Sequence, residues 1–101
     1  MQRLVEQQAD EGDVLEGGTR LGRVRYHLSV YQHFAETGEN RMVGSLEVEG
    51  HIVPIDDLGF AERRRRRAEL TLRLADGRML DFLMVNEQGT IRSTGRGLYE
   101  L

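Results

Sequence analysis

Apolar and polar residues alternate over two long stretches in the middle of the chain. In residues 23–34 the even positions are mostly apolar and the odd positions mostly polar, and residues 42–52 repeat much the same pattern. Because successive side chains of a strand point to opposite faces, a period of two indicates a strand with one buried face. The sequence therefore predicts two long, half-buried strands, which residues 35–41 join as a hairpin.

The apolar faces also predict a register for this first hairpin. Matching the two faces places Leu28 opposite Val48 on the inner side. On the outer side, the same register places His27 opposite Glu49. Pro54, the only proline, should end the second strand because it cannot donate a ladder hydrogen bond.

A second hairpin is predicted around the Asp-Gly dipeptide at positions 76–77, which is a strong turn signal. A two-residue turn would place Asp81 on the apolar face, opposite Leu72. A three-residue loop, with Gly77 in the left-handed bulge position, instead places Leu72 opposite Leu80. Thr71 then faces Asp81, so both faces match. The sequence therefore favours the bulged hairpin.

Weaker signals complete the set of elements. Val14 and Leu15 can form a short strand that Gly17 and Gly18 turn into the first long strand, residues 86–89 are typical of a turn, and residues 90–94 can form a further strand. About six strands with little helix predict an all-β fold, either a compact antiparallel barrel or a curved sandwich. Residues 14–101 are expected to form a single β-barrel domain, and the acidic residues 1–13 a flexible tail or a short helix.

Composition restricts the classes of function. The chain has 101 residues and a mass of 11.6 kDa, which suits one domain with one modest core. It contains no cysteine, which excludes disulfides and thiolate metal sites, and no ligand motif calls for a cofactor. No apolar run has the character of a signal peptide or a membrane span. A cytoplasmic location without membrane contact is expected.

Charge is distributed unevenly along the chain. The net charge is −3, and residues 1–16 alone carry −4, so the rest of the chain carries +1 and is nearly neutral. A nearly neutral body weakens the case for general nucleic-acid binding, which needs a basic field. All 14 basic residues are arginine. Such uniform usage looks more like codon bias than a selected binding device.

Two groups of residues are nevertheless candidates for binding a nucleic acid or a phosphate ligand. Arg25, His27 and Tyr31 share the polar face of the first long strand, where cations and rings suit stacking on RNA bases. Glu47 and Glu49 share that face, so ion pairing across a wet sheet is the simpler interpretation. The other group is a run of five arginines in a stretch, residues 56–69, whose net charge is only +1: Arg63, Arg64, Arg65, Arg66 and Arg67.

Metal-binding and catalytic arrangements are weakly supported. His27, Glu49 and His51 could form a metal site of two histidines and one carboxylate. The predicted register, however, places the cation Arg25 opposite His51. Ser29 lies near His27 on the same face, but an open sheet face supplies neither a pocket nor oxyanion donors. We therefore expect no metal site and no enzymatic activity.

The strand that follows the second hairpin is apolar on both faces. Met79, Leu83 and Val85 occupy its outer face and cannot all stay in water without a risk of aggregation. Their cover is either another part of the same chain or a partner subunit. The sequence thus predicts a non-enzymatic β-barrel module that acts through protein contacts and self-associates as a homodimer. The alternative is nucleic-acid or phosphate binding through the arginine run and the Arg25, His27 and Tyr31 face.

Overall fold

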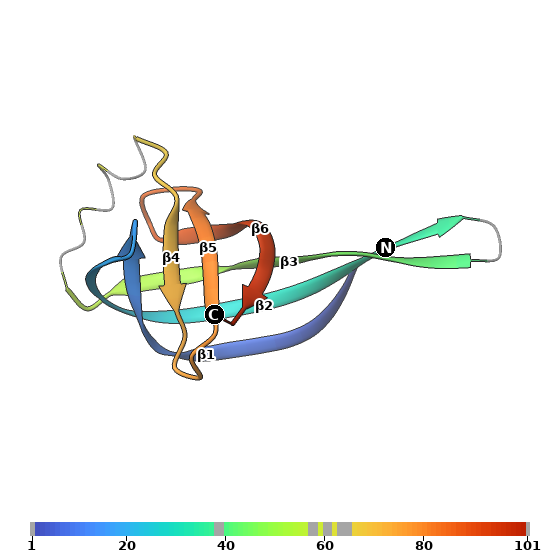
Figure 1. The fold of residues 1–101 in the computed structure, drawn as a ribbon, viewed down its shortest axis with the longest axis horizontal. Coiled ribbons are helices and arrows are strands. Elements are labelled where there is room, and N and C mark those ends of the chain that lie inside the picture. The colour runs from blue at the N-terminus through green and yellow to red at the C-terminus, as the bar shows by residue number, and fades with distance from the viewer. Residues whose placement is uncertain (1, 38–39, 57–58, 60–61, 63–65, 101) are drawn as a thin grey trace.

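The computed structural model confirms an all-β fold, a closed antiparallel barrel of six strands (Figure 1). The structure describes residues 2–37, 40–56, 59, 62 and 66–100, and the side chains of 2, 33–45 and 95–96 lie outside that description. Around the barrel the strand order is β1-β2-β3-β6-β5-β4. The strands are β1 (Gln2–Glu16), β2 (Thr19–Thr37), β3 (Asn40–Pro54), β4 (Leu70–Arg73), β5 (Met79–Met84) and β6 (Thr90–Tyr99). No helix within the described ranges is long and apolar enough to cross a membrane.

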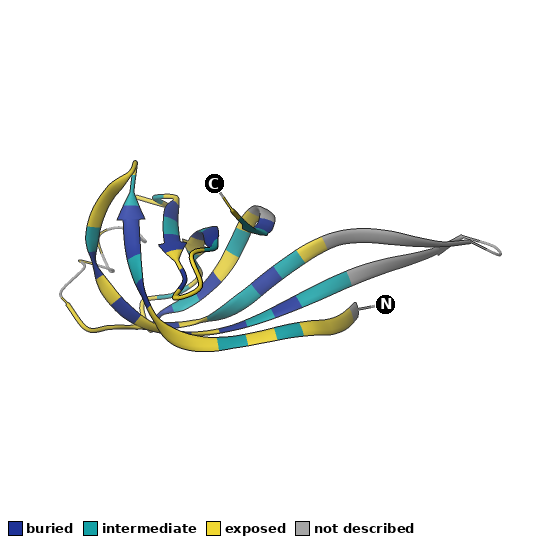
Figure 2. Ribbon diagram, turned by 60° about the horizontal axis from the view of Figure 1, so that its bottom comes forward, coloured by how far each residue is buried: buried dark blue, intermediate teal, exposed yellow. Residues whose placement is uncertain are grey.

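One hydrophobic core fills the barrel, and every strand contributes to it. The buried positions alternate along β2 and β4, as the period of two predicts, and no charged side chain is buried in the described part of the chain. Figure 2 shows this alternation as bands along the strands. The core cluster consists of Val14, Val24, Tyr26, Leu28, Val30, Val48, Ile52, Leu70, Leu72, Leu74, Leu80, Phe82 and Ile91.

The first three strands are much longer than the barrel requires. β4 pairs with β1 only at Asp13, Val14 and Leu15, and β6 pairs with β3 over three rungs, Glu49 to His51. β1, β2 and β3 continue past these rungs as a three-stranded arm, formed by residues 2–6, 30–37 and 40–48 (Figure 1). The molecule is consequently elongated, with principal extents of 50 × 28 × 22 Å.

The prediction of a flexible tail or short helix over residues 1–13 is wrong. Residues 2–13 belong to β1, which pairs with β2 from Gln2 opposite His33 to Glu16 opposite Thr19. Hydrophobic periodicity could not find this strand because its inner face carries Glu6, Gln8 and Asp10 rather than apolar residues. Backbone pairing along the edge of the long β2 holds the segment in place.

The predicted register of the first hairpin is wrong by two residues. Leu28 faces Gly50, Val30 faces Val48, and His27 faces His51. Thr37 pairs with Asn40, so the connection between the two strands is shorter than the predicted loop of residues 35–41. A bulge between Gln32 and Phe34 then changes the register by one further residue. From Val24 to Gln32 the shift of two keeps each side chain on its predicted face, so the hydrophobic pattern alone could not distinguish the two registers there. Beyond the bulge the shift is one residue, since Phe34 faces Val43.

The predicted register of the second hairpin is confirmed. Leu72 faces Leu80 and Thr71 faces Asp81, as the bulged loop requires. Gly77 has a φ of +93°, in the left-handed region that favours glycine. The Leu74 N–H closes the loop by donating to the Arg78 carbonyl at 2.8 Å.

Gly12→Ala is expected to destabilise the barrel where β1 meets β4. A Cβ at position 12 would lie 2.2 Å from the Arg73 carbonyl oxygen and 3.2 Å from the Tyr26 ring, so the two strands would have to separate. We expect a loss of about 2 kcal/mol in the free energy of unfolding, as for other overpacked sites. Urea denaturation monitored by circular dichroism measures this loss.

Gly77→Ala is the matched control for that substitution. No atom lies within 4 Å of a Cβ at position 77, so only the positive φ opposes the new side chain. The expected loss is about 1 kcal/mol. If Gly12→Ala proved no more costly than Gly77→Ala, the close approach of β1 to β4 would not be a constraint on the fold.

Candidate functional site

The three residues of the predicted interface on the outer face of β5 differ in how far they are buried. Met79 is only 7% exposed and lies between Arg73 of β4 and Tyr99 of β6, so its own chain covers it. Leu83 and Val85 are 37% and 46% exposed. Met79 is therefore not available to a partner, and that part of the predicted site is corrected. Leu83 and Val85 remain at the surface.

Polar groups surround Leu83 and Val85. Arg92 of β6 lies opposite Leu83, and its guanidinium is 3.7 Å from the Glu47 carboxylate. The Val85 N–H donates to the Thr90 carbonyl at 2.8 Å, which extends the β5–β6 ladder beyond the strand. We refer to Leu83, Val85 and the flanking Arg92 and Thr90 as the β5 face.

Asp81 accepts two hydrogen bonds beside this face. The Thr71 hydroxyl donates to Asp81 Oδ1 at 2.8 Å, and the Tyr99 hydroxyl donates to the same oxygen at 2.7 Å. The hairpin register predicted from the sequence places Thr71 opposite Asp81, but no pattern in the sequence points to Tyr99. Tyr99 lies far along the chain, and only barrel closure brings it to β5. The three groups tie β4, β5 and β6 together.

The predicted Arg25, His27 and Tyr31 face lies on the outside of β2, but its neighbours differ from those expected. Arg25 faces Val53 and His27 faces His51 across the β2–β3 pair. Arg25 and His27 are exposed and Tyr31 is half-buried. The expected pairing of Arg25 with His51 fails because the register is shifted by two.

That shift also changes the metal-site hypothesis. His27 and His51 lie directly opposite each other, while Glu49 faces Ser29. His51 Nε2 lies 2.7 Å from the Gln88 carbonyl oxygen, which engages one of its two ring nitrogens. Within the described ranges, no group of three or more histidine, aspartate or glutamate residues is placed to hold a metal ion.

Only the last two residues of the arginine run can be placed. Arg63, Arg64 and Arg65 lie outside the described residues. Arg66 forms ion pairs with Glu16 at 3.6 Å and with Glu62 at 3.8 Å. Arg67 has a φ of +53°. The described end of the run is thus partly neutralised by carboxylates.

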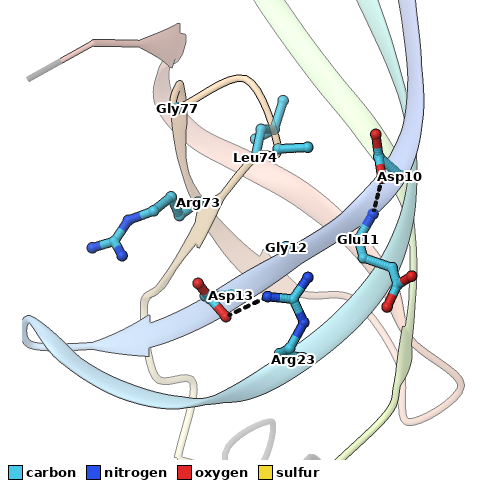
Figure 3. A pocket seen from close by; sticks show the side chains of 9 residues that line it. Asp10, Glu11, Gly12, Asp13, Arg23, Arg73, Leu74 and Gly77 are labelled. Carbon is cyan, nitrogen blue, oxygen red and sulfur yellow. Dashed lines mark hydrogen bonds and ion pairs between the residues drawn. The ribbon is translucent and has the colours of Figure 1, made fainter.

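A shallow groove of about 450 Å³ lies between β1 and the β4–β5 turn (Figure 3). Its charges are mixed, since Asp13 forms ion pairs with Arg20 at 3.0 Å and with Arg23 at 3.5 Å. Gly12 leaves room for the Tyr26 ring, whose hydroxyl accepts the Ala75 N–H at 3.0 Å. The lining residues are Asp10, Glu11, Gly12, Asp13, Arg23, Arg73, Leu74, Ala75 and Gly77. This lining has no nucleophile paired with a histidine base.

An ion-pair network next to this groove joins β1 to the β4–β5 turn. Arg78 donates to both carboxylate oxygens of Glu6, at 3.0 and 2.6 Å, and its Nε is 2.9 Å from Asp76. The hydrogen bonds from Arg78, with one from Gln8, lower the pKa of Glu6 from 4.5 to about 2. The pKa of Asp76 is lowered as well, chiefly by the Arg78 backbone N–H. A bidentate pair of this kind is among the stronger surface interactions.

Glu6→Gln is expected to remove a pH-dependent part of the stability. Because Arg78 lowers the Glu6 pKa, the ion pair stabilises the fold fully above pH 4.5, and this stabilisation is lost as the pH falls towards 2. Solvent screens the pair, so its contribution is about 1 kcal/mol. Urea unfolding between about pH 7 and pH 3 should show this loss in the wild-type chain but not in the variant.

Arg78→Gln should flatten the pH profile in the same window, because the same ion pair is lost. The double variant should behave like Arg78→Gln, because both lack the Glu6 pair and the ion pair of Arg78 with Asp76, which Glu6→Gln retains. If Glu6→Gln kept the wild-type pH profile, the network would not link β1 to the turn energetically.

Comparisons with protein-family models, with curated proteins and with solved structures found no match for this chain. A function therefore has to be argued from its own residues. The β5 face is an exposed apolar site with a polar border, the groove is polar and shallow, and the β2 face combines cations with rings. Of these, the β5 face offers apolar area to a partner.

Proposed function

We propose that this protein is a non-enzymatic interaction module that acts through protein–protein contacts and self-associates through the β5 face. The observation that carries the proposal is the exposure of Leu83 and Val85, at 37% and 46%, at the end of a strand whose opposite face buries Leu80 and Phe82 in the core. Two large apolar side chains held in place by a rigid strand lose little conformational entropy on binding. A partner that covers them gains from their burial.

The surroundings of the β5 face support this proposal. Interfaces typically have an apolar centre and a polar rim in which arginine is common. Arg92 and Thr90 provide such a rim beside Leu83 and Val85. An interface of standard size covers roughly 800 Å² of each partner. The chain exposes 6340 Å², so such an interface would use about an eighth of its surface.

Leu83→Asp is expected to reduce self-association, because it places a charge in the apolar centre of the contact. Light scattering over a hundredfold range of protein concentration should give a lower molar mass for the variant than for the wild type. The difference should persist between about 0.1 and 0.5 M salt, because apolar burial is not screened by ions. At matched concentration, we expect association at least about tenfold weaker, since each tenfold change is about 1.4 kcal/mol.

Ile55→Asp is the matched control, since Ile55 is also exposed and follows β3, where its N–H donates to the Arg23 carbonyl. It should leave the molar mass unchanged. Equal molar masses for the wild type and Leu83→Asp at every concentration would contradict self-association through the β5 face.

The alternative is nucleic-acid or phosphate binding, and one observation favours it. Arg25 and His27 lie exposed on the outer face of β2, with Tyr31 half-buried beside them. Against it, Glu11 lies opposite Arg25 on β1 and Glu47 lies opposite Tyr31 on β3. These carboxylates reduce the positive potential that a phosphate backbone requires.

Fluorescence anisotropy with a labelled single-stranded RNA of about ten nucleotides tests this alternative. We expect no binding that depends on Arg25, so the wild type and Arg25→Ala should give the same titration. Binding that falls steeply and log-linearly with salt, and that Arg25→Ala weakens, would favour the nucleic-acid function over the proposed one.

A further inference from the structure

Over most of its length, the outer edge of β1 has no partner strand among the described residues. β1 pairs with β2 on one side throughout, but on its other side β4 meets it only at Asp13, Val14 and Leu15. Residues 3–12 have no strand partner on that second edge within the described part of the chain. Unpaired N–H and C=O groups along a strand edge readily accept another strand.

Exposed apolar side chains lie near the free end of this edge. Leu4 and Val5 are 46% and 45% exposed. A bulge between Leu4 and Glu6 makes Val5 the extra residue. Leu4 therefore shares the outer face of β1 with Gln7 and Ala9, while Arg3 shares its inner face with Asp10. These face assignments determine which residues could meet if a second strand were added.

The edge is complementary to itself in antiparallel orientation. A two-fold axis at Gln7, with Val5 again as the extra residue, places Leu4 opposite Ala9 of a second copy and Arg3 opposite Asp10 of that copy. Each pair lies on one face of the sheet, and each occurs twice because the contact is isologous. One pair joins apolar side chains and the other joins opposite charges, as stable cross-strand pairs do.

Glu6, the other acidic residue close to the two-fold axis, does not disturb this pairing. The same axis brings Glu6 opposite the second copy's Gln8, but both oxygens of Glu6 already accept hydrogen bonds from Arg78 of their own chain. A charge satisfied in this way adds no uncompensated repulsion. Oδ1 of Asp10 accepts the Glu11 N–H at 2.8 Å, and its other carboxylate oxygen can accept from Arg3 of the second copy.

We infer that the free edge of β1 binds the same edge of a second copy of this chain, giving a continuous six-stranded sheet in the order β3-β2-β1-β1-β2-β3. The two barrels would lie at opposite ends of this sheet, because each chain enters it through its arm. Strand addition of this kind uses backbone hydrogen bonds for affinity and side-chain pairs for register. It is independent of the β5 face.

Charge reversal across the proposed pair provides the test. In sedimentation equilibrium of the full chain, Arg3→Glu would face Asp10, and Asp10→Arg would face Arg3, so each single variant should associate about tenfold more weakly than the wild type at low salt. An equimolar mixture of the two single variants should recover wild-type association, because both of its charge pairs are then opposite in sign. The chain carrying both substitutions should recover it as well.

Glu11→Arg is the matched control. It makes the same change in charge at the neighbouring residue, on the other face of the strand, where the proposed pairing brings only Gln2 opposite it. It should leave association unchanged. A wild-type chain that stays monomeric, or single variants that associate as tightly as the wild type, would overturn the inference, as would a mixture that fails to recover.

The variants distinguish association through the β1 edge from association through the β5 face. If Leu83→Asp reduces the assembly and the β1 variants do not, the proposed β5 contact stands and this inference fails. If only the β1 variants reduce it, this inference stands and the proposed β5 contact fails. If both surfaces associate, the assembly exceeds a dimer and each set of variants removes one contact.

Discussion

Two short seams close this barrel, and most of the structure depends on them. Three rungs join β1 to β4 and three join β3 to β6, whereas β1, β2 and β3 share much longer ladders. A seam of three rungs has few backbone hydrogen bonds, so side chains reinforce it. At the β1–β4 seam, the Tyr26 hydroxyl accepts the Ala75 N–H, and Arg78 binds Glu6. At the β3–β6 seam, the Ser93 hydroxyl accepts the Val48 N–H at 3.0 Å.

The seams also explain why polar residues occur where a simple barrel would place apolar ones. Glu6 and Gln8 are on the inner face of β1, but this part of the strand has left the barrel and faces the β4–β5 turn rather than the core. Gly12 lies at the point of separation, where the absence of a side chain lets Tyr26 reach the turn. The polar inner face of β1 is therefore a consequence of the difference in strand length.

Periodicity predicted the faces of the strands well, and it predicted register only where turn chemistry added a constraint. The bulged loop at Gly77 aligned Leu72 with Leu80 correctly, because a two-residue turn would have placed Asp81 against the core side. The first hairpin had no such constraint, so a shift of two residues between Val24 and Gln32 preserved the faces there and could not be detected from the pattern. β1 escaped prediction because pairing with β2, rather than burial of apolar groups, makes it a strand.

For the candidate site, too, the sequence predicted which residues share a face but not which distant residues meet. The apolar outer face of β5 was visible in the sequence, since Leu83 and Val85 break the alternation, but the burial of Met79 between neighbouring strands was not. The contact of Tyr99 with Asp81 depends on barrel closure, which joins residues 18 positions apart. The free edge of β1 was hidden for a different reason. An edge is defined by the strand that is missing beside it, and that depends on topology rather than on any residue.

The difference in strand length then gives the two exposed surfaces different physical characters. Closing a sheet into a barrel normally removes its edges. A strand that is longer than the neighbour it pairs with at the point of closure nevertheless keeps an unpaired edge, as β1 does beside β4. The β1 edge combines backbone groups with charges, so salt screens part of its attraction. The β5 face depends on apolar burial, which salt does not weaken. The response of an assembly to ionic strength therefore reports which of the two surfaces holds it together, because the barrel keeps them on separate strands.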